Sequence, residues 1–171
     1  MKLYISSACL NEKNILKKIQ FLIDQGVQNI ELSSGNDYEQ NIESHLNNFQ
    51  KNYNTNFLIH NYFPDPKYDF KLNLASLDKK IFNMSIEHCL KAINISKKLG
   101  LEKYAVHAGF FRDFKKNNNN YFLNEDQNIN RDLSYLRFIE AWKILKANSI
   151  TGPKLYIENN VLTKKHYLFE K

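Results

Sequence analysis

Cysteine is scarce in this chain: only Cys9 and Cys89 occur among its 171 residues. Their positions match no metal-binding or redox spacing, and isolated thiols are typical of a reducing compartment. No apolar run approaches the roughly 18 residues of a membrane span, and the N-terminal segment lacks the apolar core of a signal peptide. We therefore expect a cytoplasmic protein that does not contact a membrane.

Arginine is scarce as well, although the chain carries a net charge of +6. Nearly all of the positive charge is lysine, and arginine occurs only at Arg112, Arg131 and Arg137. Specific recognition of nucleic acids relies on arginine side chains and clustered positive charge, whereas these lysines are scattered along the sequence. The composition therefore disfavours a nucleic-acid-binding protein.

Glycine is limited to five residues, and no Gly-rich GxGxxG or Walker-type loop follows any apolar run. This absence disfavours the nucleotide-binding α/β folds, in which such a loop cradles phosphates. The chain has instead a regular alternation of short apolar runs and amphipathic stretches. We predict strands at residues 2–6, 27–32, 56–60, 103–107 and 155–158, and helices at about 12–25, 38–53, 78–99 and 130–148.

The alternation of strands and helices predicts a single α/β domain over residues 1–171, with parallel strands joined by right-handed crossovers. A closed (β/α)8 TIM barrel needs eight such units and typically about 250 residues. With about five parallel strands and four to five helices, the chain is expected to form a partial (β/α)8 TIM barrel. An Asn-rich loop at about 110–128 is expected to be mobile or functional.

Polar side chains stand at the ends of the predicted strands: Glu31, His60, His107 and Glu158. Because barrel strands present their functional groups at their carboxyl ends, two imidazoles and one or two carboxylates are expected to converge. Such a set suits Zn²⁺, Mn²⁺ or Fe²⁺, and the ion can polarise a carbonyl or activate a water. For each residue taken alone, a structural role is the alternative. Arg112, in the Asn-rich loop, either holds a phosphate or is a solvated loop charge.

Several short motifs accompany these strand ends. His60 and Pro64 form H-x-x-x-P, followed by NLAS at 73–76, VHAG at 106–109 and IEN at 157–159. As a set they resemble the xylose isomerase-like TIM barrel superfamily, which contains sugar-phosphate isomerases and epimerases and the endonuclease IV repair enzymes. The resemblance covers residues 2–162, the first five βα units of that fold.

The resemblance implies that His60, His107 and Glu158 line a divalent metal centre holding Mn²⁺, Zn²⁺ or Mg²⁺. It also implies that Glu158 helps to move a proton between adjacent carbons of a sugar. We expect Glu31, Tyr62, Arg112 and Asn159 to contact the substrate. Members of the superfamily complete this centre with residues from strands six to eight, which we do not expect within residues 1–171.

The expected function is therefore that of a sugar or sugar-phosphate isomerase or epimerase of carbohydrate metabolism, acting by metal-assisted proton transfer. The chain is expected to be truncated after its fifth strand, to hold the metal weakly and to be inactive by itself. Its expected partners are a small sugar and either a second copy or a complementing C-terminal fragment. The alternatives are an endonuclease IV-like enzyme that cuts abasic sites and a non-catalytic remnant or binding module.

Overall fold

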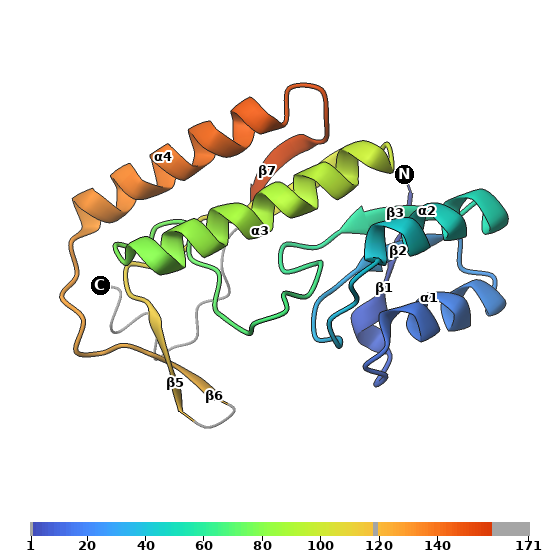
Figure 1. Cartoon of the computed structure of the whole chain (residues 1–171), viewed down its shortest axis with the longest axis horizontal. Coiled ribbons are helices and arrows are strands. Elements are labelled where there is room, and N and C mark those ends of the chain that lie inside the picture. Colours follow the sequence, from blue (N-terminus) through green and yellow to red (C-terminus); the bar gives the residue numbers. More distant parts are fainter. Residues whose placement is uncertain (1, 118–119, 159–171) are drawn as a thin grey trace.

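The computed structural model describes residues 2–117 and 120–158 of the chain. Its main sheet has five parallel strands in the order β1-β2-β3-β4-β7, and helices connect them (Figure 1). The prediction of a partial (β/α)8 barrel is confirmed. The strands are β1 (Ile5–Ser6), β2 (Asn29–Leu32), β3 (Asn56–Ile59), β4 (Lys103–His107) and β7 (Lys154–Glu158), and the helices are α1 (Ile15–Asp24), α2 (Ile42–Tyr53), α3 (Lys79–Lys98) and α4 (Arg131–Asn148).

Capping side chains decide where three of these helices begin. Asp78 and Asn130 accept hydrogen bonds from backbone N–H groups in the first turns of α3 and α4, close to the predicted starts. Helix α1 begins three residues later than predicted, because Asn14 rather than Asn11 accepts the N–H groups of its first turn. Helix α2 also begins later than predicted, at Ile42, and β1 is shorter than the apolar run that predicted it.

The two faces of the sheet have different surroundings. On one face Ile30, Phe57 and Val106 are at most 3% exposed and join a core with apolar side chains of the helices. On the other face, which would be the interior of a closed barrel, Glu31 and Leu58 are only partly buried. The alternation of side chains along each strand therefore places the strand-end polar groups on the open face.

A short antiparallel hairpin occupies the loop that follows β4, where the sequence predicted no regular structure. It consists of β5 (Phe114–Asn117) and β6 (Asn120–Leu123) (Figure 1). Taken together, most residues of the two strands are exposed. The pattern of burial explains the missed prediction, because neither strand shows the alternation of buried apolar and exposed polar residues that identifies a half-buried strand.

Helix α4 and the edge strand β7 carry apolar side chains on surfaces that no described residue covers. One side of α4 is buried at Ala141 and Leu145, whereas Leu136 and Ile139 are 60% and 45% exposed. On β7, Ile157 is 51% exposed. A soluble helix of this kind normally has one apolar face, so the second apolar face of α4 is a surface suited to further packing. Among the described helices, none combines the length and hydropathy needed to cross a bilayer.

Candidate functional site

The carboxyl ends of β2, β3, β4 and β7 bring the predicted polar side chains to one edge of the sheet. His107 and Glu158 are the last residues of β4 and β7, and His60 directly follows β3. The backbone N–H of His60 donates to the Leu32 carbonyl at 3.0 Å, and its carbonyl accepts from the Phe63 N–H at 2.9 Å. Backbone hydrogen bonds therefore fix the position of this histidine although it lies just outside its strand.

His107 and Glu158 form the closest pair of this site. The two residues are register partners on neighbouring parallel strands, and His107 Nε2 lies 3.7 Å from Glu158 Oε2. Burial lowers the pKa of His107 below its usual value, the Glu158 carboxylate opposes this shift, and His60 adds to it. The His107 imidazole is therefore neutral at pH 7, the state in which its nitrogen can accept a proton or bind a metal.

His60 contributes a second imidazole with an unsatisfied atom. Its ring centroid lies 6.3 Å from that of His107, with the two ring planes at 89°. Its Nδ1 is buried and has no hydrogen-bond partner among the described residues. Buried polar atoms are normally paired, so an orphaned ring nitrogen at a strand end is a candidate ligand-binding atom.

Tyr62, which we expect to contact the substrate, lies beside His107. Its ring centroid lies 6.1 Å from that of His107 in an edge-to-face arrangement. Burial raises the pKa of Tyr62 to about 12, so its hydroxyl keeps its proton and can donate a hydrogen bond at neutral pH.

The other predicted residues are less closely connected to the histidines. Glu31 pairs with Leu58 across the β2–β3 register, and no described hydrogen bond or ion pair joins its carboxylate to His60 or His107. Arg112 lies in the loop after β4, where its Nε donates to the Gln127 carbonyl at 3.2 Å. Asn159 lies outside the described residues.

The types of donor atom at this site suit a divalent metal ion, but the side chains are not arranged as a complete metal site. Imidazole nitrogen and carboxylate oxygen suit Zn²⁺ and Mn²⁺. Two ligands at about 2.0–2.2 Å from one ion lie roughly 3–3.5 Å apart, which is close to the 3.7 Å between His107 and Glu158. The described residues nevertheless contain no cluster of three or more His, Cys, Asp or Glu side chains that could hold an ion. His60 lies beside the pair, with its ring centroid 6.3 Å from that of His107, and is the candidate third ligand.

The loop that follows His107 is held by a residue that sequence reasoning did not single out. Buried Asn73 accepts hydrogen bonds from the N–H groups of Phe110, at 2.8 Å, and Ala75, at 3.1 Å. Its Nδ2 donates to Asp113 Oδ1 at 2.8 Å and to the Phe110 carbonyl at 3.0 Å. Gly109 packs so closely that an added Cβ would lie 2.5 Å from Asn73 Oδ1. The NLAS motif was the available signal, and its asparagine joins the loops after β3 and β4.

No protein-family model matches the sequence, and no curated protein matches it. Among solved structures, a D-tagatose 3-epimerase-like protein has a TM-score of 0.65 and 16% identity, covering 99% of this chain and 59% of that chain. A D-psicose 3-epimerase from Clostridium cellulolyticum H10, determined with D-tagatose, has a TM-score of 0.62 and 16% identity, covering 100% and 54%. A protein from Thermus thermophilus, soaked with ZnCl2, has a TM-score of 0.56 and 14% identity, covering 93% and 55%.

The chain has the fold of these solved proteins. The resemblance inferred from the strand-end motifs is thereby confirmed for the fold. The chain spans little more than half the length of these solved chains, from 54% to 59%.

Proposed function

We propose that this chain supplies part of the active site of a sugar isomerase or epimerase, in which a proton moves to or from a carbon next to a carbonyl. The observation that carries the proposal is the pairing of His107 with Glu158 at 3.7 Å, beside the unsatisfied Nδ1 of His60. These groups stand at the carboxyl ends of strands in a barrel-type sheet, where such folds place their chemistry. Two structural neighbours support the same reaction class, since they are described as an epimerase and an epimerase-like protein.

A divalent ion bound by His60, His107 and Glu158 would polarise the carbonyl of the sugar and so acidify the neighbouring C–H bond. Within the chain, Glu158 is the proposed base, because its carboxylate is 46% exposed and open to a ligand on the inner face of the sheet. Neutral His107 lies beside it, and its one acceptor nitrogen is available to that ion. Tyr62 keeps its proton and can donate a hydrogen bond to a sugar oxygen.

Net epimerisation needs a second acid–base group on the opposite side of the reacting carbon. The strand-end groups described here do not supply it, and we propose that it comes from further βα units that continue the sheet beyond β7. The exposed side of α4 and the outer edge of β7 are the surface on which those units would pack. A homo-oligomer is the alternative occupant of that surface.

Deuterium exchange tests the proposed function directly. Removal and return of a proton on one side of the carbon needs only one base, so the chain itself is expected to exchange the C3 proton of D-tagatose in D₂O with Mn²⁺ present. Glu158→Gln should abolish this exchange, and Asp132→Asn, at an exposed carboxylate in the first turn of α4, should retain it. Equal exchange by the Glu158→Gln variant, or none by the wild-type chain, would contradict the proposal.

The endonuclease alternative makes a different prediction in the same preparation. Incision of duplex DNA at an abasic site, lost in Glu158→Gln, would assign the strand-end groups to that reaction instead. Absence of metal binding, proton exchange and incision together would favour the non-catalytic binding module.

A further inference from the structure

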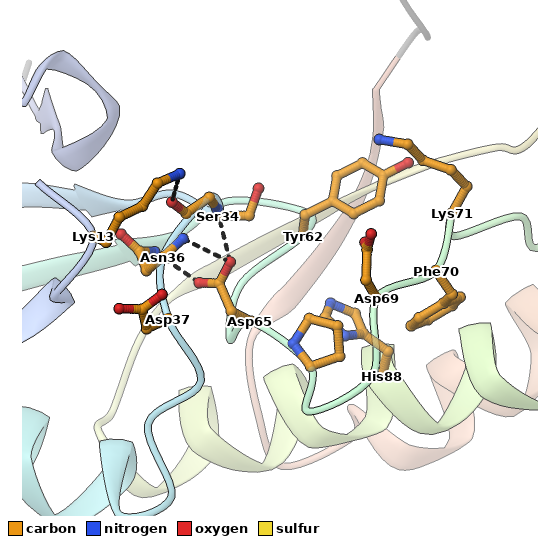
Figure 2. A pocket seen from close by; sticks show the side chains of 12 residues that line it. Lys13, Ser34, Asn36, Asp37, Tyr62, Asp65, Asp69, Phe70, Lys71 and His88 are labelled. Atoms are coloured by element: carbon orange, nitrogen blue, oxygen red, sulfur yellow. Dashed lines mark hydrogen bonds between the residues drawn. The ribbon is translucent and has the colours of Figure 1, made fainter. Parts of the chain in front are cut away.

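A cavity of about 440 Å³ opens between the loop after β2 and the loop after β3 (Figure 2). Its volume is within the range of roughly 300–1,000 Å³ that is usual for small-molecule sites. Tyr62 lines the cavity and also lies 6.1 Å from the His107 ring, between centroids. The cavity is therefore next to the strand-end site and shares Tyr62 with it, whereas the proposed reaction uses none of the other lining residues.

One wall of the cavity is fixed by Asp65. Its carboxylate accepts hydrogen bonds from the backbone N–H groups of Gly35, at 2.7 Å, and Asn36, at 3.0 Å (Figure 2). The Asn36 Nδ2 donates to the other carboxylate oxygen at 2.7 Å, and Lys13 Nζ donates to the Gly35 carbonyl at 3.2 Å. Hydrogen bonds within the chain therefore fix this wall of the cavity. Both oxygens of the Asp65 carboxylate already accept hydrogen bonds from the chain and are less available to a ligand.

The opposite wall is held by the hairpin. Asp69 Oδ2 lies 2.9 Å from Lys116 Nζ of β5, so this carboxylate is already paired. The Lys71 ammonium lies 5.8 Å from the Tyr62 ring centroid and 4.9 Å from that of Tyr121 in β6. The structure describes no ion pair or hydrogen bond for the Lys71 ammonium, so its N–H groups remain available to a ligand.

The charges around the cavity balance. Lys116 neutralises Asp69, which leaves Lys13 and Lys71 against Asp37 and Asp65. The Asp37 carboxylate is exposed and has no described hydrogen-bond or ion-pair partner. A phosphate group offers only acceptors at its ionised oxygens and would face carboxylates here, whereas a sugar hydroxyl can both donate and accept.

We propose that this cavity binds the uncharged, hydroxyl-bearing end of the sugar, so that the substrate is a free sugar rather than a sugar phosphate. The proposal rests on the proposed function and narrows its substrate class. Asp37 accepts hydrogen bonds from sugar hydroxyls, and Lys71 and Tyr62 donate to them. Tyr62 lines the cavity and also contacts the His107 ring edge-to-face, so a sugar that extends from the cavity to the strand-end site would pass this side chain.

Isothermal titration of the full chain with D-tagatose and with D-tagatose 6-phosphate tests this assignment. The free sugar should bind at least about tenfold more tightly than the ester, because a charge-assisted hydrogen bond contributes roughly that factor. Asp37→Asn should weaken binding of the free sugar by about tenfold and should reduce the preference over the ester. Asp132→Asn, which removes an exposed carboxylate at the start of α4, is the matched control and should bind as the wild type does.

Tighter binding of the ester than of the free sugar, or unchanged affinity in Asp37→Asn, would overturn the assignment. The result is separable from that of the proposed function, because binding is measured without turnover. Glu158→Gln should lose proton exchange and keep the Asp37-dependent binding. If the wild type binds the sugar without exchanging its proton, only the proposed function is contradicted. If the wild type exchanges the proton and Asp37→Asn binds the sugar equally well, only the assignment of the cavity as a sugar site is contradicted.

Discussion

His107 and Glu158 are direct register partners on neighbouring parallel strands, and 3.7 Å separates His107 Nε2 from Glu158 Oε2. In a parallel pair, the register determines which side chains meet at the carboxyl end. A shift of one residue would turn Glu158 to the helix-covered face. The buried Tyr104 and Val106, which alternate with His107 along β4, therefore help to set the position of the imidazole.

Buried His88 should make the stability of the chain sensitive to acid. It lies in α3, with Nε2 3.3 Å from the Asn61 carbonyl, and burial lowers its pKa to about 4. The unfolded chain takes up a proton near pH 6.5, whereas the native chain takes it up only near pH 4, so stability is complete above pH 6.5 and falls between these values. The loss should reach about 3 kcal/mol near pH 4.

Urea denaturation at pH 7 and at pH 4.5 measures this effect. Between these two pH values, the free energy of unfolding of His88→Gln should fall by about 2–3 kcal/mol less than that of the wild type. The reason is that glutamine takes up no proton when the chain unfolds. His45→Gln, at an exposed histidine of α2, should follow the wild-type pH dependence. The same acid-dependent loss in the wild type and in His88→Gln would show that His88 is not the responsible group.

Asn73 should be required for the loop after β4. Its removal leaves the N–H and carbonyl of Phe110 and the N–H of Ala75 without their described partner. Asn73→Ala is expected to cost about 3 kcal/mol of unfolding free energy, because buried polar groups lose their hydrogen bonds. Asn94→Ala, on the exposed face of α3, should change stability by less than about 0.5 kcal/mol. Similar stabilities of the two variants would contradict the structural role of Asn73.

The outer side of α4 should tolerate charge, in contrast to its inner side. Leu136→Glu at a position 60% exposed should change the stability of the chain by no more than about 0.5 kcal/mol. Leu145→Ala at a position 0% exposed should cost about 2–5 kcal/mol, because it leaves a cavity in the core. Denaturant unfolding of both variants measures the difference. A large loss in Leu136→Glu would show that this side of α4 is already packed within the chain.

The fold was predictable because its signals are local. Apolar runs that end in polar residues, and helices that begin at Asp78 and Asn130, gave five strands and four helices in the observed order. The start of α1 was wrong because Asn11 and Asn14 are equally good caps by type, and only the folded backbone shows which one is used. The β5–β6 hairpin was missed because its strands bury little apolar surface.

The placement of the strand-end side chains was predictable for the same reason, whereas their surroundings were not. Alternation along β4 and β7 is enough to place His107 and Glu158 on one face. The cavity beside Tyr62 depends on the hydrogen bonds that Asp65 accepts from the loop after β2. These bonds join Asp65 to residues that lie 30 and 29 positions earlier in the sequence. Long-range contacts of this kind leave no periodic pattern in a sequence. The position of His60 relative to the other two predicted ligands likewise depends on tertiary packing.

Metal binding by the purified chain tests the central claim most directly. Calorimetric titration with Mn²⁺ or Zn²⁺ should show one ion bound per chain. The affinity of Glu158→Gln for the ion should be at least about tenfold lower, because this substitution removes a metal ligand. Asp132→Asn, at an exposed carboxylate in the first turn of α4, should bind the ion as the wild type does. Absence of stoichiometric binding in the wild type, or equal affinity in Glu158→Gln, would contradict the assignment of His60, His107 and Glu158 to a metal-dependent sugar isomerase or epimerase site.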